Sequence, residues 1–208
     1  MRDRKTGILE AAARVIARRG VRGLRVEELA AEAGVSKALV YYHFGDRARL
    51  LRHTLHFIGD RAERDARRPA SEPAGPEDRV RELEDRLLHQ LQDVPEVREK
   101  RVAWGELRSG AVFEPELREG LEQASGEWTR EVADLLADAA PGAPRGAPTA
   151  AAERLTILLE GLSTRWLIGG LPVGHARALL REAIRAEVGS LRIRNPARVA
   201  ASGTHPLR

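Results

Sequence analysis

The chain contains no cysteine, so disulfide bonds, cysteine-ligated zinc sites and thiol catalysis are excluded. The longest stretch without Lys, Arg, Asp or Glu is residues 166–176, well short of the roughly 20 apolar residues that a membrane helix needs. No N-terminal apolar segment resembles a signal peptide. We therefore expect a cytoplasmic protein that does not enter a membrane.

Aromatic residues are also scarce, at 4% of the chain, whereas Ala, Leu, Arg and Glu are abundant. This composition favours helices, because these side chains lose little rotamer freedom there. Every strong apolar periodicity is helical, and no alternating run or hairpin turn indicates a strand. With glycine and proline at the breaks, the pattern predicts an all-α fold with helices at about residues 6–19, 26–33, 36–44, 46–66, 77–92, 95–110, 115–139, 149–168 and 173–191.

Two segments rich in proline, residues 69–76 and 141–148, are predicted to be loops. The apolar period is lost from residue 192, which predicts a disordered tail over residues 192–208.

Positive charge is concentrated at one end of the chain. Residues 1–53 hold 12 Lys/Arg and 6 Asp/Glu, a net charge of +6, and the remainder holds 23 and 25, a net charge of −2. A basic end on a slightly acidic body indicates a surface that binds a polyanion such as DNA. On charge alone, a solvated Arg-rich surface is an equal alternative.

The helices predicted at 26–33 and 36–44 are short, and the turn between them contains Gly34. This is the spacing of a helix-turn-helix, whose second helix lies in the major groove of DNA. Val35, Val40 and Phe44 fall on one side of the second helix and are expected to pack inward. The exposed and flanking positions are then Lys37, Ala38, Leu39, Tyr41, Tyr42 and His43.

These residue types suit DNA. A lysine can donate to guanine, small apolar side chains can contact a thymine methyl group, and Tyr and His can donate to phosphates. The alternative is that the Tyr-Tyr-His run fills a small core.

Residues 34–44, GVSKALVYYHF, resemble the recognition helix of the TetR family. The Arg-Gly end of the first helix, the run Val-x-x-Leu-Ala-x-x-Ala-Gly-Val-Ser from Val26, and Asp46-Arg47-x-x-Leu50 fit the same family, so that the similarity spans about residues 6–55. The resemblance implies a homodimeric transcriptional regulator, most often a repressor. Such a protein binds an inverted-repeat operator in double-stranded DNA and is released by a small-molecule effector.

The resemblance also implies roles for single residues. Lys37, Ala38, Leu39 and Tyr42 would face the bases, and Tyr41 and His43 would hold phosphates. Ser36 would cap the recognition helix and donate to a phosphate, and Arg47 would reach a phosphate or close the turn. Arg25 stands where the family often has Thr or Ser. The predicted DNA-binding set is therefore Arg25, Ser36, Lys37, Ala38, Leu39, Tyr41, Tyr42, His43 and Arg47.

The layout of the later helices is loosely similar to TetR members related to the choline-responsive repressor. The last two helices are apolar on more than one side, which predicts a four-helix dimer interface; an intramolecular core is the alternative. The predicted interface residues are Leu155, Leu162, Trp166, Leu180 and Ile184. An apolar cavity for an unknown effector is predicted near Trp104, Phe113, Trp128 and Trp166, which are otherwise ordinary core residues.

Enzyme signatures are missing: the sequence has no GxxxxGK[ST], GxGxxG, GxSxG or HExxH. We therefore expect neither catalysis nor a cofactor. His53 and His56 are spaced for a metal pair, but without nearby carboxylates we expect no metal. Residues 1–50 are predicted to form the DNA-binding domain and residues 51–191 the ligand-binding and dimerisation domain. The competing hypothesis is a helical small-molecule carrier, against which the intact set Lys37, Tyr41, Tyr42 and His43 argues.

Overall fold

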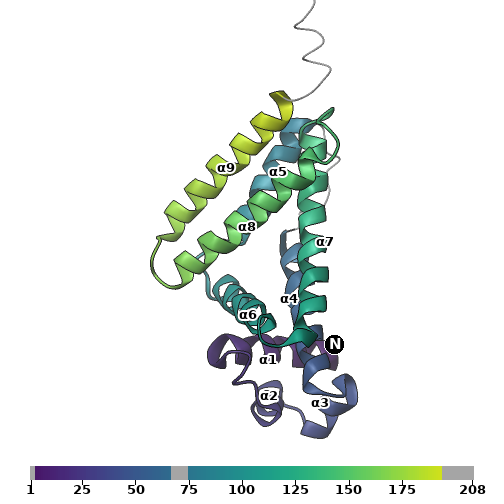
Figure 1. Ribbon diagram of the computed structural model, residues 1–208. Coiled ribbons are helices and arrows are strands. Elements are labelled where there is room, and N and C mark those ends of the chain that lie inside the picture. Colours follow the sequence, from purple (N-terminus) through teal and green to yellow (C-terminus); the bar gives the residue numbers. More distant parts are fainter. Residues whose placement is uncertain (1–2, 67–74, 194–208) are drawn as a thin grey trace, which may run out of the picture. The chain divides into compact units, whose positions relative to one another are not determined.

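The computed structural model describes residues 3–66 and 75–193, with side chains described for residues 3–59 and 75–193. Within these ranges the regular structure is entirely helical (Figure 1). The helices are α1 (Arg4–Arg19), α2 (Val26–Ala33), α3 (Lys37–Phe44), α4 (Arg47–Ala66), α5 (Pro76–His89), α6 (Pro95–Ala111), α7 (Pro115–Ala139), α8 (Ala147–Leu167) and α9 (Val173–Ile193).

The all-α prediction is confirmed, and each predicted helix is present with small differences at its ends. Helix α1 begins before the predicted residue 6, because the Asp3 side chain accepts the Lys5 N–H at 3.3 Å and caps the helix. Of the predicted loop at 69–76, Pro76 begins α5 and residues 69–74 lie outside the described residues. Of the predicted tail, residues 192 and 193 end α9, and residues 194–208 lie outside the described residues.

The chain divides into two compact units. The first contains residues 1–65 and 93–126, and therefore α1 to α4, α6 and the first part of α7. The second contains residues 66–92 and 127–208, and therefore α5, the rest of α7, α8 and α9. This grouping by contact does not follow the predicted functional boundary after residue 50, since α6 packs with the DNA-binding helices. That boundary concerns function and stays a prediction.

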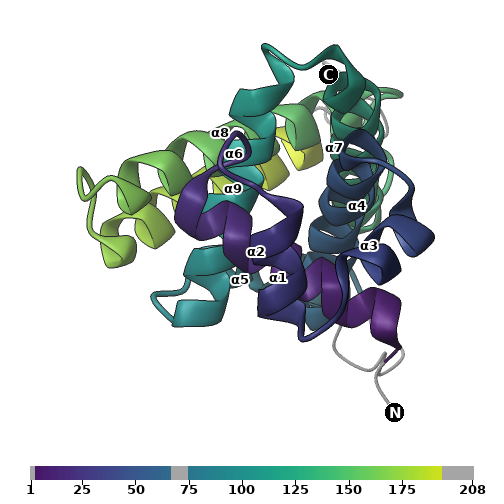
Figure 2. The same ribbon diagram turned by 90° about the horizontal axis from the view of Figure 1, so that it is seen from below.

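The core of the first unit lies where α1 packs against α2 and α6. Helices α1, α2 and α3 are seen together in Figure 2. Each fully buried Leu or Ile contributes about 1.5–3 kcal/mol through removal of its surface from water. The fully buried large side chains of this core are Ile8, Ile16, Leu29, Leu50, Leu51, Leu55, Leu107 and Leu117.

The second unit has its own core, in which α8 and α9 lie side by side in antiparallel directions (Figure 1). Helix α9 also packs against α5. Arg177 of α9 donates to the carbonyls of Leu88, near the end of α5, and of Leu91, just beyond it, at 2.6 and 2.8 Å. Among the described residues, no helix is both long and apolar enough to cross a membrane.

Candidate nucleic-acid interface

The turn between α2 and α3 is set by Gly34 and Ser36, which are two residues apart. Gly34 ends α2 in the left-handed conformation (φ 65°, ψ 36°), which glycine adopts without steric cost. Ser36 follows and caps α3: its hydroxyl accepts the Leu39 N–H at 3.2 Å, as predicted from the sequence. The start of the recognition helix is therefore fixed on both sides of the turn.

Helix α3 is buried along one side and open along the other. Val40 and Phe44 are 2% and 3% exposed and belong to the first unit's core, whereas Tyr41 and Tyr42 are 50% and 82% exposed. Lys37 and Ala38 are exposed as well, while Leu39 and His43 are half-buried. The alternative that Tyr41 and Tyr42 fill the core is therefore wrong. The core holds α3 by its inner side and leaves the predicted DNA-reading side chains on the surface.

Lys37 has an acidic partner that the sequence analysis did not predict. Its Nζ donates to Glu27 Oε1 of α2 at 3.0 Å, and both side chains are more than half exposed. The pKa of Glu27 is held below its ordinary value by a bond from its own backbone N–H and by the bond from Lys37. In this state Glu27 engages one of the three ammonium donors of Lys37.

The start of α2 carries no side-chain cap. Arg25 occupies the N-cap position with an extended backbone, is exposed, and makes no capping hydrogen bond. Glu27 and Glu28 in the first turn place negative charge at the positive end of the helix dipole. Arg25 is thus open to a phosphate, a role that stays a prediction.

Helix α2 is tied to α1 by a shared carboxylate. Glu32 accepts from Arg14 at 2.6 Å and from Arg18 at 2.5 Å. These two hydrogen bonds lower the pKa of Glu32, and the bond from Arg14 has the larger effect. The pair adds polar contacts to the apolar packing between the two helices.

Arg47, at the start of α4, connects the α1–α2 loop to the α6–α7 turn. It donates to the Val21 carbonyl at 2.7 Å and to Glu114 Oε2 at 3.1 Å. Two further contacts hold the α1–α2 loop: the Val21 N–H donates to Glu106 of α6 at 3.4 Å, and the Arg22 guanidinium lies 5.0 Å from the ring centroid of Phe113 in the α6–α7 turn. In this state Arg47 closes the turn, and a phosphate contact by Arg47 stays a prediction.

Arg47→Ala should lower the free energy of unfolding by about 1–2 kcal/mol, because it removes both hydrogen bonds and leaves the partly buried Glu114 without this partner. Thermal or urea unfolding measures the loss. Arg47→Lys is the matched control. It keeps the charge but lacks the planar guanidinium that donates to both acceptors at once. Equal stability of all three proteins would show that these contacts do not hold the loop.

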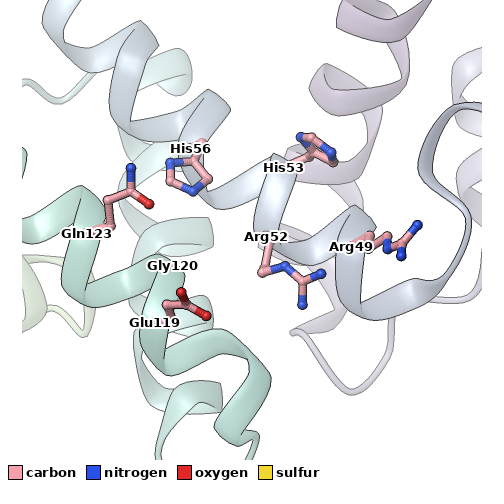
Figure 3. Close-up of a pocket in the computed structure, with 7 residues that line it drawn as sticks. All are labelled: Arg49, Arg52, His53, His56, Glu119, Gly120 and Gln123. Atoms are coloured by element: carbon pink, nitrogen blue, oxygen red, sulfur yellow. The ribbon is translucent and has the colours of Figure 1, made fainter.

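A polar cleft of about 500 Å³ lies between α4 and α7 in the first unit (Figure 3). His53 lies in the wall of the cleft, and its pKa is lowered mainly by burial and to a smaller extent by the charge of Lys5. His53 and His56 were considered as a metal pair, but no group of three or more His, Asp or Glu in the described part of the chain is placed to hold a metal. The residues lining the cleft are Arg49, Arg52, His53, His56, Glu119, Gly120 and Gln123.

The cleft was not predicted from the sequence. One signal was available: the four residues on α4 recur at i, i+3, i+4 and i+7, so that they share one helical face. The other wall comes from α7, more than 60 residues later, and its position is known only from the fold.

The predicted ligand residues are divided between the two units. Trp104 is partly buried against the first core, and Phe113 is 69% exposed. Trp128 packs partly buried against the second core, in which Trp166 is 4% exposed. None of the four lines the cleft between α4 and α7. An effector site near these aromatic residues stays a prediction.

The predicted dimer residues need a correction. Leu155, Leu162, Trp166, Leu180 and Ile184 are between 0% and 6% exposed in a single subunit, where they form part of the second core. Helices α5 and α7 already cover the side of α8 and α9 that carries them. These side chains are therefore packed within the subunit, and a contact between subunits through α8 and α9 stays a prediction that would use the opposite sides of the two helices.

The fold and the recognition helix match known regulators. Residues 8–54 match the family model of bacterial regulatory proteins of the tetR family, and residues 76–189 match the C-terminal domain of BetI-type transcriptional repressors. The protein belongs to the TetR family. The HTH-type transcriptional regulator BetI of Paraburkholderia xenovorans (strain LB400) is 28% identical over 177 residues, which are 85% of this chain and 88% of that protein.

Solved structures of TetR-type regulators have the same fold. A protein described as a TetR-family transcriptional regulator from Rhodococcus sp. is 42% identical with a TM-score of 0.81, covering 90% of this chain and all of that one. A regulator from Saccharomonospora viridis, solved in complex with choline, is 25% identical with a TM-score of 0.72, covering 87% and 95%. The chain is thus a TetR-family transcriptional regulator with a BetI-type repressor domain, and not an enzyme.

Proposed function

We propose that the protein is a homodimeric repressor that holds an inverted-repeat operator through two copies of α3 and releases it when a small-molecule effector binds. The observation that carries this proposal is the surface of α3. Lys37, Tyr41 and Tyr42 are exposed on a helix that Ser36 caps and that Val40 and Phe44 anchor in the core. Such a protein acts in the cytoplasm, where its DNA lies.

The roles of the exposed side chains follow from their chemistry. Lys37 suits guanine O6 and N7, and Ala38, Leu39 and Tyr42 suit the neighbouring base edges in the major groove. Ser36, Tyr41 and His43 donate to phosphates, which position the helix without reading sequence. Arg25 and Arg47 extend the positive charge at the two ends of the helix-turn-helix.

A second copy of the chain is the proposed partner of α8 and α9. Their outward sides carry exposed apolar residues: Ile157 is 69% exposed on α8, Ile168 directly after the last residue of α8 is 76% exposed, and Leu179 and Ile193 are 37% and 72% exposed on α9. Exposed apolar surface of this kind is typical of a protein–protein interface. A two-fold dimer then requires a two-fold operator, with half-sites about one helical turn of DNA apart.

The first effector to test is choline, the ligand of the S. viridis regulator. A quaternary ammonium binds over aromatic faces, and Trp104 and Trp128 are both only partly buried. Within the first unit, the contacts of Arg47, Glu106 and Phe113 join α6 and the start of α7 to the helix-turn-helix. A ligand that displaces α6 would therefore move the DNA-binding helices and weaken DNA binding, by about 5- to 150-fold for a typical coupling.

Selection of bound sites from random duplex DNA tests the function. We expect an inverted repeat whose binding weakens steeply with salt, because phosphate contacts release counterions. Titration of choline into the complex should then release the protein from the selected site. Recovery of no preferred sequence would contradict the regulator and favour a carrier. A selected operator that choline leaves bound would contradict choline as the effector.

A further inference from the structure

The cleft between α4 and α7 carries net positive charge. Arg49, Arg52, His53 and His56 share one face of α4, and Glu119 is the single acid among the lining residues (Figure 3). A guanidinium stays charged at any physiological pH, whereas the two imidazoles add charge only when protonated. The cleft therefore attracts anions and repels cations.

Gly120 of α7 is one of the residues that line this cleft. It is buried, and a Cβ atom there would lie 3.7 Å from Arg52 Cγ and from Leu55 Cδ2. These are ordinary van der Waals distances, so α7 packs directly against α4 at this position. The volume of about 500 Å³ lies within the usual range of small-molecule sites.

The guanidinium groups retain donors for a ligand. Arg52 has no hydrogen-bond or ion-pair partner within the ranges 3–59 and 75–193. Arg49 Nε lies 3.8 Å from Asp46 Oδ2, too far for a hydrogen bond, and both side chains are more than 60% exposed. Arginine donors in pairs fit the oxygens of a carboxylate or a phosphate.

We propose that this cleft binds a small metabolite that carries a phosphate or carboxylate group. Arg52 and Arg49 pair with its oxygens, and His56 and Gln123 donate hydrogen bonds from the two walls. A quaternary ammonium does not fit these charges, so the site is separate from that of a choline-type effector. The binding itself does not depend on the proposed function, but its use as a second control of DNA binding does.

The cleft is connected to the recognition helix by direct contact. The His53 ring packs edge-on against Phe44, with 5.6 Å between ring centroids, and Phe44 is the buried last residue of α3. The Lys5 ammonium group lies 5.9 Å from the same Phe44 ring. An anion in the cleft neutralises charge beside α3 and interacts with His53, which contacts Phe44. Its binding should therefore lower operator affinity.

The test is calorimetric titration of the full chain, without DNA, at constant ionic strength. The probes are inorganic phosphate, succinate and choline chloride. We expect phosphate or succinate to saturate one site per chain with a Kd of about 1 mM or lower, and choline not to displace it. The tighter of the two anions identifies the preferred group. Saturation by neither anion, or displacement of the bound anion by choline, would overturn the proposal.

Three variants locate the binding. Arg52→Gln should weaken it about tenfold or more, because it removes a charge-assisted pair. Glu119→Gln should strengthen it, a gain that unfolding cannot produce. Arg98→Gln removes an exposed guanidinium on α6 that pairs with Asp93 at 3.3 Å, outside the cleft, and should change nothing.

Equal weakening by Arg52→Gln and Arg98→Gln would show general surface attraction and overturn the site. The site would also be overturned if the protein bound neither anion and Arg52→Gln lowered its operator affinity. Arg52 would then be a DNA phosphate contact. If operator binding stays intact while anion binding is absent, the site fails and the proposed function stands. Anion binding without any DNA binding would be the failure of the proposed function alone.

Discussion

Replacing Ile157 by glutamate should leave each subunit folded, convert the proposed homodimer to a monomer and abolish tight operator binding. Ile157 is 69% exposed on the outward side of α8, so the change costs little within one subunit. In the dimer it would bury an unpaired carboxylate, which costs about 3–5 kcal/mol for each charge. A monomer contacts a single half-site, and its affinity should fall about 1,000-fold or more, towards non-specific binding.

Sedimentation equilibrium measures the dissociation, and mobility of the labelled operator measures the loss of binding. Val112→Glu is the matched control, because Val112 is also apolar and 64% exposed but belongs to the first unit and to neither α8 nor α9. It should remain a dimer. If Ile157→Glu also sediments as a dimer, the subunits meet on another surface.

Leu180→Glu separates the interface from the core. Leu180 is fully buried within the second unit, so a glutamate there should destabilise the subunit itself and lower its melting temperature sharply. Ile157→Glu should melt as a folded monomer. The contrast decides between the interface predicted from apolar periodicity and the one that burial supports.

The sequence predicted the helices closely because glycine, proline and capping residues mark their ends. Gly34 and Ser36 carry local information: one takes a left-handed conformation and the other caps α3, and neither needs a distant partner. The inward side of α3 was predicted for a similar reason, since Val40 and Phe44 are four residues apart and therefore share one helical face.

Packing between distant segments could not be predicted in this way. An apolar face on α9 shows that something covers Leu180 and Ile184, but not whether the cover is α5 of the same chain or a second subunit. The Glu27–Lys37 pair depends on how α2 and α3 cross and on two long side chains. The cleft requires α4 and α7 to meet, and the contacts of Arg47 require the α6–α7 turn to reach the α1–α2 loop.

Lys37→Ala should lower affinity for the selected operator about 10- to 100-fold and change which sequence is preferred, since a lost base contact costs about 1–3 kcal/mol. Random DNA should be weakened less, because its binding depends on phosphates. Tyr41→Phe is the companion variant: it removes a proposed phosphate donor and should weaken selected and random DNA equally. Equal weakening of both by Lys37→Ala would mean that Lys37 contacts a phosphate.

The partner of Lys37 allows a sharper version of this test. In the free protein Glu27 accepts from Lys37 at 3.0 Å, so DNA must compete with a carboxylate for the ammonium group. Glu27→Gln should therefore raise affinity severalfold. In the Lys37→Ala background the same change should have little effect if Glu27 acts only through Lys37, and an undiminished effect would mean that Glu27 repels DNA phosphates directly. Unchanged affinity of Glu27→Gln with Lys37 present would show that the ion pair does not restrain the lysine before it binds.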